Sequence, residues 1–391
     1  MAWLTGGWGK RVEITVADVG TTDLTHFPLL LKLGASVGTG TDDVSFIFDE
    51  LTSDANRKKI AVTKSDGTTE IYVEIEKWDD ANEAAWLWVS KSDLVLSSSA
   101  TTTLYLYFDS THADNTTYVA DAGSRAEVWD SSNAAVFHLN ESSGGAIDSL
   151  GDQNGVYQGD LPTPAAVGEL PGQDLDGTGD YVTAADHAGL DVTGNLTIEM
   201  WVDTDVASNN MFILVDKTGS SSSNASYGLW YDDRDAQSNP DRIRFLYGDT
   251  NTDSVDWDAS GIEGVLTYIV ARYDGTDHEI FADAVSKATA QRGAITPAAN
   301  ALNLGIGAIA SSGSVPLAGL MSEVRISATD RSDAWILANF NSQKDNLVAW
   351  GGEEVATSIK LVIGVPIANV KTINGGAIAN VKSFLGVSNV S

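Results

Sequence analysis

Short apolar stretches with an alternating pattern recur along most of this chain, and they limit the folds that it can adopt. Residues 71–76 alternate between aliphatic and more polar side chains, which is typical of a strand with one buried face. Turn-forming clusters such as residues 65–67 separate these stretches. A helical pattern is expected at residues 332–341, with Asp330 or Ser332 as the N-cap. The sequence therefore predicts an all-β fold.

A chain of 391 residues is long enough for two or three domains. The spacing of strands and turns predicts an N-terminal β-sandwich at residues 1–124 and a second β-sandwich at residues 125–352. A linker at residues 353–358 and a short β repeat module at residues 359–391 complete the predicted organisation.

The repeat module has a period of eleven residues. Lys360, Lys371 and Lys382 are spaced by eleven, and residues 367–371 recur as residues 378–382. A unit this small cannot bury its own core, so the units should stack on each other or on a partner. We predict an anchoring or oligomerisation module, with a homotrimer as the expected state. A flexible basic tail is the alternative.

The balance of charge argues against two classes of partner. Lys and Arg together number 23 and Asp and Glu 54, which gives a formal net charge of −31. Such a surface repels nucleic-acid phosphates and anionic lipid, so we expect neither as a partner. No run approaches the roughly 18 apolar residues of a membrane span, so no membrane insertion is expected. The sequence has no Cys and therefore no disulfide or thiolate metal site.

The first residues do not have the pattern of a secretory signal peptide. Residues 1–11 contain no charged stretch followed by an apolar one. We therefore expect no export signal, although the predicted sandwiches are of an extracellular type.

Several stretches of the second segment match one known superfamily in both order and spacing. They are residues 136–141, 146–149, 174–182, 196–202, 271–275, 318–327 and 330–335. On these stretches the segment resembles the laminin-G-like, concanavalin A-type lectin/glucanase superfamily, which implies a jelly roll.

The first segment is similar to a family of unknown function that often precedes such domains. The similarity lies in residues 11–15, 24–30, 73–78 and 104–107. The pair of domains, followed by C-terminal repeats, resembles virion structural proteins of tailed phages. This resemblance of architecture implies a virion role by analogy, since fold alone does not fix function.

One turn departs from the pattern of the superfamily. The hairpin turn after residues 278–282 often reads Asp-Gly, whereas this chain has Asp283 and Ala284. Because Ala adopts a positive φ poorly, we expect this turn to be rebuilt.

The resemblance implies one structural Ca²⁺ between an early loop and a late strand. The positions carried over are Asp148, with loop carbonyls near residues 151–154, and Glu323 on the late strand. Oxygen ligands suit Ca²⁺, and an ion bound only by the folded state would add stability. The acid-rich residues 174–180 are interpreted instead as a capped hairpin turn.

No catalytic residue is expected. Glucanases of the superfamily carry a Glu-x-Asp-x-x-Glu strand, whereas Glu199 stands alone in its stretch. The five His residues have no metal-ligand spacing, and the sequence contains no serine nucleophile motif.

Two aromatic and acidic stretches are candidates for glycan binding. Trp230, Asp232 and Asp233 lie together, and Trp257 lies between two aspartates. Sugars need an aromatic surface beside carboxylates and amides. The alternative is that Trp230 and Trp257 are core residues, since Trp is usually largely buried.

These features favour a virion surface protein of a tailed virus, either a head decoration or fibre or a tail-associated adhesin. The repeats would bind other virion proteins of the capsid or tail, and the jelly roll would bind host surface glycans weakly with avidity from many copies. The expected location is the virion surface. A secreted or cell-surface prokaryotic lectin is the alternative, and a glycoside hydrolase is disfavoured by the missing acid pair.

Overall fold

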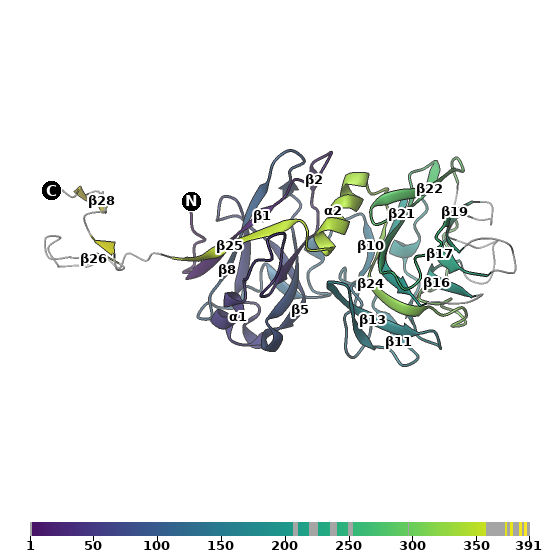
Figure 1. Ribbon diagram of the computed structural model, residues 1–391, viewed down its shortest axis with the longest axis horizontal. Helices are drawn as coiled ribbons and strands as arrows, with labels where there is room; N and C mark the ends of the chain where they lie inside the picture. Colours follow the sequence, from purple (N-terminus) through teal and green to yellow (C-terminus); the bar gives the residue numbers. More distant parts are fainter. Residues whose placement is uncertain are drawn as a thin grey trace.

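The computed structural model describes residues 2–205, 210–218, 226–234, 241–248, 253–295 and 297–356, together with four two-residue strands beyond residue 371. Two β-sandwiches lie side by side along the long axis, and helix α2 (Asp333–Gln343) lies between them (Figure 1). Nearly all of the regular structure is strand, so the predicted all-β fold is confirmed.

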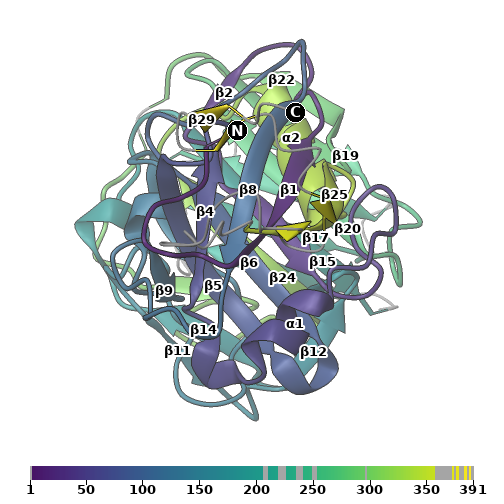
Figure 2. The ribbon, with the colours of Figure 1, turned by 90° about the vertical axis from the view of Figure 1, so that its left-hand side faces the viewer.

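A single sheet forms both layers of the first sandwich. Its strand order is β25-β1-β8-β4-β5-β6-β3, and β9 pairs with β5. Strand β5 belongs to both layers, because its first residues pair with β4 and the rest with β6. Ile14, Leu87 and Leu106 contribute to the core between the layers. Figure 2 shows the layer that contains β1, β8 and β4. The bounds are β1 (Lys10–Val16), β2 (Leu24–Thr25), β3 (Leu29–Leu33), α1 (Phe46–Leu51), β4 (Ile60–Lys64), β5 (Glu70–Asp79), β6 (Ala84–Ser90), β7 (Val95–Leu96), β8 (Thr102–Phe108), β9 (Val119–Asp121) and β25 (Val348–Val355).

The second sandwich packs two antiparallel sheets face to face around its own core. One sheet has the order β12-β13-β24-β15-β20-β21-β22, with β10 beside β24, and the other has the order β11-β14-β23-β16-β17-β18-β19. Alternation decides which side chains are inside: Ile198 and Met200 of β15 lie in the core. The bounds are β10 (Asn133–Phe137), β11 (Gly155–Gln158), β12 (Pro164–Val167), β13 (Leu170–Asp176), β14 (Tyr181–Ala184), β15 (Leu196–Thr204), β16 (Met211–Asp216), β17 (Tyr227–Asp232), β18 (Arg242–Tyr247), β19 (Ser254–Asp258), β20 (Thr267–Tyr273), β21 (Asp277–Ala282), β22 (Val285–Gln291), β23 (Leu304–Ile306) and β24 (Ala318–Ser327).

The last long strand returns to the first sandwich. β25 pairs with β1, and its Val348 and Trp350 pack into the core of the first sandwich. The division drawn from the sequence placed residues up to 352 in the second unit, so the structure differs from it here. The second sandwich is therefore an insertion, and the chain passes between the sandwiches twice. Asp130 in the outgoing passage and Arg331 in the returning one form an ion pair with a 2.8 Å Nη2–Oδ1 contact.

A third hydrophobic layer, here called the junction, joins the two sandwiches. Helix α2 belongs to both sides, because its Trp335 packs into the core of the first sandwich and its Ile336 into the junction. Its N-cap is Ser332, the second of the two expected caps, whose Oγ accepts a hydrogen bond from the Trp335 backbone N–H at 3.2 Å. The buried members of the junction are Leu30, Trp88, Val128, Trp129, Val136, Val167, Leu170, Trp201, Tyr268, Val270, Phe281 and Ile336.

The turn between β21 and β22 corrects one expectation. We expected Asp283 and Ala284 to rebuild it, but both residues keep a positive φ, 50° and 60°, and the strands remain joined by two residues. Such a turn matches the twist of the flanking strands, and this match outweighs the strain of an alanine in the left-handed region.

Most of the repeat module lies outside the described residues. The four strands that are described form two small hairpins: β26 (Thr372–Ile373) with β27 (Gly376–Ala377), and β28 (Ser383–Phe384) with β29 (Val387–Ser388). Equivalent strands are therefore eleven residues apart, as in the sequence repeat. Within the described part of the chain, no helix has the length and apolar character needed to cross a bilayer.

Candidate functional site at the junction of the sandwiches

The two carboxylates expected to share a Ca²⁺ have separate partners. Asp148 is 1% exposed, and its Oδ1 accepts the backbone N–H groups of Val136 at 3.0 Å and Leu150 at 3.2 Å. These bonds tie the carboxylate to the backbone of the strand before it and of its own loop. Glu323 is 1% exposed and is hydrogen-bonded instead to His138 and Arg325. A Ca²⁺ ion at this pair stays a prediction.

Glu323 instead lies beside two residues that the sequence analysis did not select. Glu76, His138 and Glu323, here called the junction cluster, each offer a ligand atom within 4.8 Å of the others. His138 Nδ1 is 2.6 Å from Glu323 Oε1 and 3.8 Å from Glu76 Oε2. All three side chains are buried. The cluster joins the sandwiches, since Glu76 belongs to the first and the other two to the second.

Irregular backbone places these side chains. A bulge in β5 between Ile75 and Lys77 inserts Glu76 into the face that meets the second sandwich. His138 follows β10 directly. Glu323 lies where the pairing of β24 with β15 shifts register, and its φ is +56°. A non-glycine residue with positive φ in a strand is strained, and such strain is often found at functional sites.

Each member of the junction cluster has an outer partner. The Trp88 indole N–H donates to Glu76 Oε2 at 2.7 Å. Arg325 donates to Glu323 Oε2, and its guanidinium lies 4.3 Å from the centre of the Trp88 ring. On the far side of the imidazole, His138 Nε2 lies 3.7 Å from a Glu74 carboxylate oxygen. These partners fix the orientation of the three side chains.

Burial and mutual charge shift the pKa values of the cluster. Burial raises the pKa of Glu76 to about 8. Burial alone would lower the pKa of His138, but Glu323 and Glu76 outweigh it and raise that pKa well above its ordinary value. Burial alone would raise the pKa of Glu323, yet His138 and Arg325 lower it. The site thus favours positive charge at its centre.

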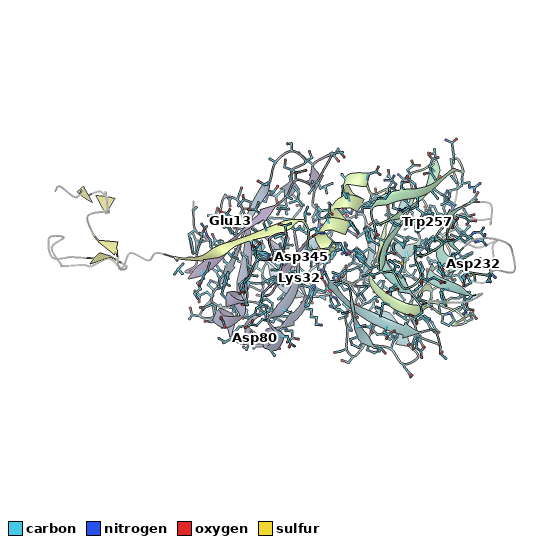
Figure 3. All side chains as sticks on the ribbon, in the orientation of Figure 1. Glu13, Lys32, Asp80, Asp232, Trp257 and Asp345 are labelled. Atoms are coloured by element: carbon cyan, nitrogen blue, oxygen red, sulfur yellow. The ribbon has the colours of Figure 1, made fainter. Side chains whose placement is uncertain are left out.

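A surface groove runs beside the junction cluster. It consists of two hollows of about 350 and 360 Å³ that share Lys77 and Asn140 in their linings. Trp86 lines the second hollow, and its indole N–H donates to the Glu169 carbonyl oxygen at 2.9 Å. The Lys77 ammonium lies 5.5 Å from the centre of the Trp86 ring. Lys32, at the junction in Figure 3, pairs with the Glu169 carboxylate. An aromatic ring, an amide and charged groups therefore meet in one groove.

The structure separates the two tryptophans of the predicted glycan site. Trp230 of β17 lies between the core residues Leu229 and Tyr231, so its side chain is on the outer face of the sheet. Trp257 of β19 is partly buried and packs against the core from inside. They therefore cannot form one platform.

The predicted acidic partners are largely buried. Asp232 and Asp233 are 7% and 8% exposed. Asp232 accepts hydrogen bonds from Arg234 and Arg242, which outweigh the effect of burial and lower its pKa to about 2. Figure 3 shows Asp232 and Trp257 in the part of the second sandwich that faces away from the first.

Glu199, the isolated acid of β15, lies beneath helix α2. It is 2% exposed and accepts hydrogen bonds from Tyr268 and, at 2.7 Å, from Asn339 of the helix. In this position its carboxylate cannot contact a polysaccharide.

Known proteins were compared with the chain by sequence and by structure. Residues 176–337 match the family model described as the concanavalin A-like lectin/glucanases superfamily. No curated protein matches the sequence. Among solved structures, the receptor-binding domain of botulinum neurotoxin C/D mosaic serotype has 11% identity, a TM-score of 0.42 and coverage of 55% of each chain.

Two further structures are similar at the same level. The binding domain of botulinum neurotoxin DC in complex with SialylT has 10% identity and a TM-score of 0.40, over 55% of this chain and 52% of that one. The serotype D binding domain has 11% identity and a TM-score of 0.43, over 54% and 52%. The chain thus spans about half the length of these structures. Residues 176–337, less than half of the chain, are thus similar to a concanavalin A-like lectin/glucanase domain.

Proposed function

We propose that this chain is a surface protein of a tailed-virus particle that binds host surface glycans without cleaving them. The concanavalin A-like domain supports the carbohydrate-binding part, since this superfamily includes lectins. The virion part rests on the resemblance of the two-domain and repeat organisation. The repeat module would hold the chain on other virion proteins or join it into a homotrimer.

The groove beside the junction is the observation that carries glycan binding. Trp86 is partly exposed there, with Lys77 and Asn140 beside it. A pyranose ring can stack on an indole face while its hydroxyls bond to an amide and an ammonium. We assign the groove, rather than the outer sheet face around Trp230, as the first glycan site to test.

A glycan-binding experiment can separate the two sites. The full chain is coupled to beads at high density and applied to a panel of bacterial capsular and lipopolysaccharide-derived glycans. Trp86→Ala should lower bead retention at least about tenfold, because many weak contacts multiply the loss at each site. Trp230→Ala and the matched control Trp3→Ala, near the N-terminus, should retain wild-type binding. If only Trp230→Ala lost glycan binding, the glycan site would lie on the outer sheet face around Trp230.

The virion role has its own test. Particles purified by density gradient from a lysate are probed with antibodies against the full chain. We expect the chain to remain with the particles, and a chain ending at residue 356 to be lost from them. Recovery of the full chain only in the soluble fraction would favour a free lectin.

A further inference from the structure

In and around the junction cluster, buried carboxyl groups outnumber the cationic side chains. Four buried carboxylates surround the guanidinium of Arg325 and the imidazole of His138. They belong to Glu74, Glu76, Glu199 and Glu323. Even with a charged imidazole, the carboxylates outnumber the positive groups. Buried charge of one sign is costly, so such a site takes up a proton or a cation.

One unused ligand atom points to a cation. Glu76 Oε1 is buried and has no hydrogen-bond partner among the described residues. An orphaned carboxylate oxygen in the interior needs an explanation, and an ion is one. Glu76 Oε2 is held by Trp88 and Glu323 Oε2 by Arg325, which leaves one oxygen of each carboxylate for a ligand.

We propose that the junction cluster is a binding site for a first-row divalent transition-metal ion, with Glu76, His138 Nδ1 and Glu323 Oε1 as ligands. One imidazole and two carboxylates form a donor set that Zn²⁺ accepts. The outer shell is also present, because the Glu74 carboxylate lies next to the ring nitrogen that would not bind the metal. The ion would tie β5 of the first sandwich to β24 of the second.

The spacing of the ligands indicates what changes on binding. His138 Nδ1 and Glu323 Oε1 are 2.6 Å apart and share a proton when no metal is bound. With metal–ligand bonds of about 2.1 Å, two ligand atoms on one ion lie roughly 3 Å or more apart. The ion therefore replaces the shared proton, and binding releases it. Glu76 also helps to line one of the two hollows of the surface groove.

Zinc titration of the full chain tests this site. The protein is treated with a chelator, dialysed and titrated with ZnCl₂ by calorimetry at about pH 7.5, in two buffers of different protonation enthalpy. We expect one equivalent bound, with a heat that differs between the buffers because a proton is released. Glu76→Gln should lower the Zn²⁺ affinity about 100-fold or more, and Glu127→Gln, at an exposed carboxylate, should leave it unchanged.

A second readout does not depend on a variant folding correctly. Co²⁺ added to the chelator-treated wild type should produce visible absorption bands that Zn²⁺ then removes. Absence of both Zn²⁺ uptake and Co²⁺ bands in the wild type would overturn the proposal and leave a proton as the occupant of the cluster. Wild-type affinity in a folded Glu76→Gln chain would also overturn it.

Discussion

The interior of each sandwich and the junction between the sandwiches are built from different chemistry. The interiors are mainly aliphatic and aromatic, as at Leu229 in the second sandwich and Leu106 in the first. The junction combines apolar residues with an ionic network around Arg325. Apolar burial contributes stability in proportion to area and tolerates many arrangements. A buried ionic network adds little net stability, but removal of one partner is costly, so we infer that it fixes how the sandwiches meet.

Removal of the central cation should break the junction most severely. Arg325 is 1% exposed and pairs with Glu323, while its Nη1 donates to Asn339 at 3.2 Å. Arg325→Met should lower the free energy of unfolding by about 3–5 kcal/mol, because it leaves buried carboxylates unpaired. Urea denaturation measures this decrease in the free energy of unfolding. The control Arg244→Met, at a surface ion pair, should lower the free energy of unfolding by less than about 1 kcal/mol. An equal loss in both variants would contradict the inference that the buried network at the junction is the more sensitive to removal of one partner.

A cavity in the interior should cost somewhat less. Leu229 is fully buried in the core of the second sandwich. Leu229→Ala should lower the free energy of unfolding by about 3 kcal/mol, from lost burial and the cavity left behind. Val156→Ala, at a side chain that is 57% exposed, is the control and should change it by less than about 0.5 kcal/mol. If Val156→Ala lowered the free energy of unfolding as much as Leu229→Ala, burial would not be the cause of the loss of stability.

The ion pair between the two passages should make stability depend on pH. Burial alone would raise the pKa of Asp130, but the Arg331 guanidinium outweighs it and holds the pKa below its ordinary value. Because the folded pKa is the lower one, the pair stabilises the fold above the unfolded pKa of about 3.9, and this contribution is lost as pH falls through the folded pKa. Asp130→Asn should cost about 1.5 kcal/mol at pH 7 and progressively less in acid. Denaturation curves of the wild type and Asp130→Asn, recorded from about pH 2 to about pH 7, measure this change. If the difference in the free energy of unfolding stayed constant across that range, ionisation of Asp130 would not contribute to the pH dependence.

The smallest expected effect lies at a turn whose Ala284 packs against the junction. Ala284 has a φ of 60°, which a glycine adopts without strain. Ala284→Gly should raise the free energy of unfolding by about 0.5 kcal/mol, since relief of strain exceeds the extra freedom of glycine in the unfolded chain. The shift in the midpoint of thermal unfolding measures this gain in stability. A lower midpoint would mean that the turn gains more from the Ala284 methyl group than it loses in strain.

Local patterns predicted part of the local structure. Alternation at residues 71–76 indicated a strand that lies within β5, and Ser332 was one of the two N-caps expected for α2. Alternation also separates Trp230 from Trp257, because Leu229 and Tyr231 flank the first, while Val255, two residues before the second, is in the core. The two tryptophans share an acidic, aromatic composition, which does not show the sheet face that each occupies, whereas strand parity does.

The junction cluster could not be predicted in this way. Glu76, His138 and Glu323 come from three distant parts of the sequence, and two of them lie at irregularities that no periodic pattern shows. The return of β25 to the first sheet is equally hidden, because an edge strand has the same sequence pattern whichever sheet it joins. Both features depend on which surfaces meet after the sandwiches form.

The insertion of one sandwich into the other determines the path along which a mechanical force would be transmitted through the molecule. A force applied beyond Val355 and resisted by a ligand on the second sandwich would pass along the backbone of β25 and α2 directly into β24. That covalent path avoids every other strand of the first sandwich. The first sandwich would then keep β25 extended by pairing it with β1 at the edge of the sheet, while its other strands would carry little of the tension.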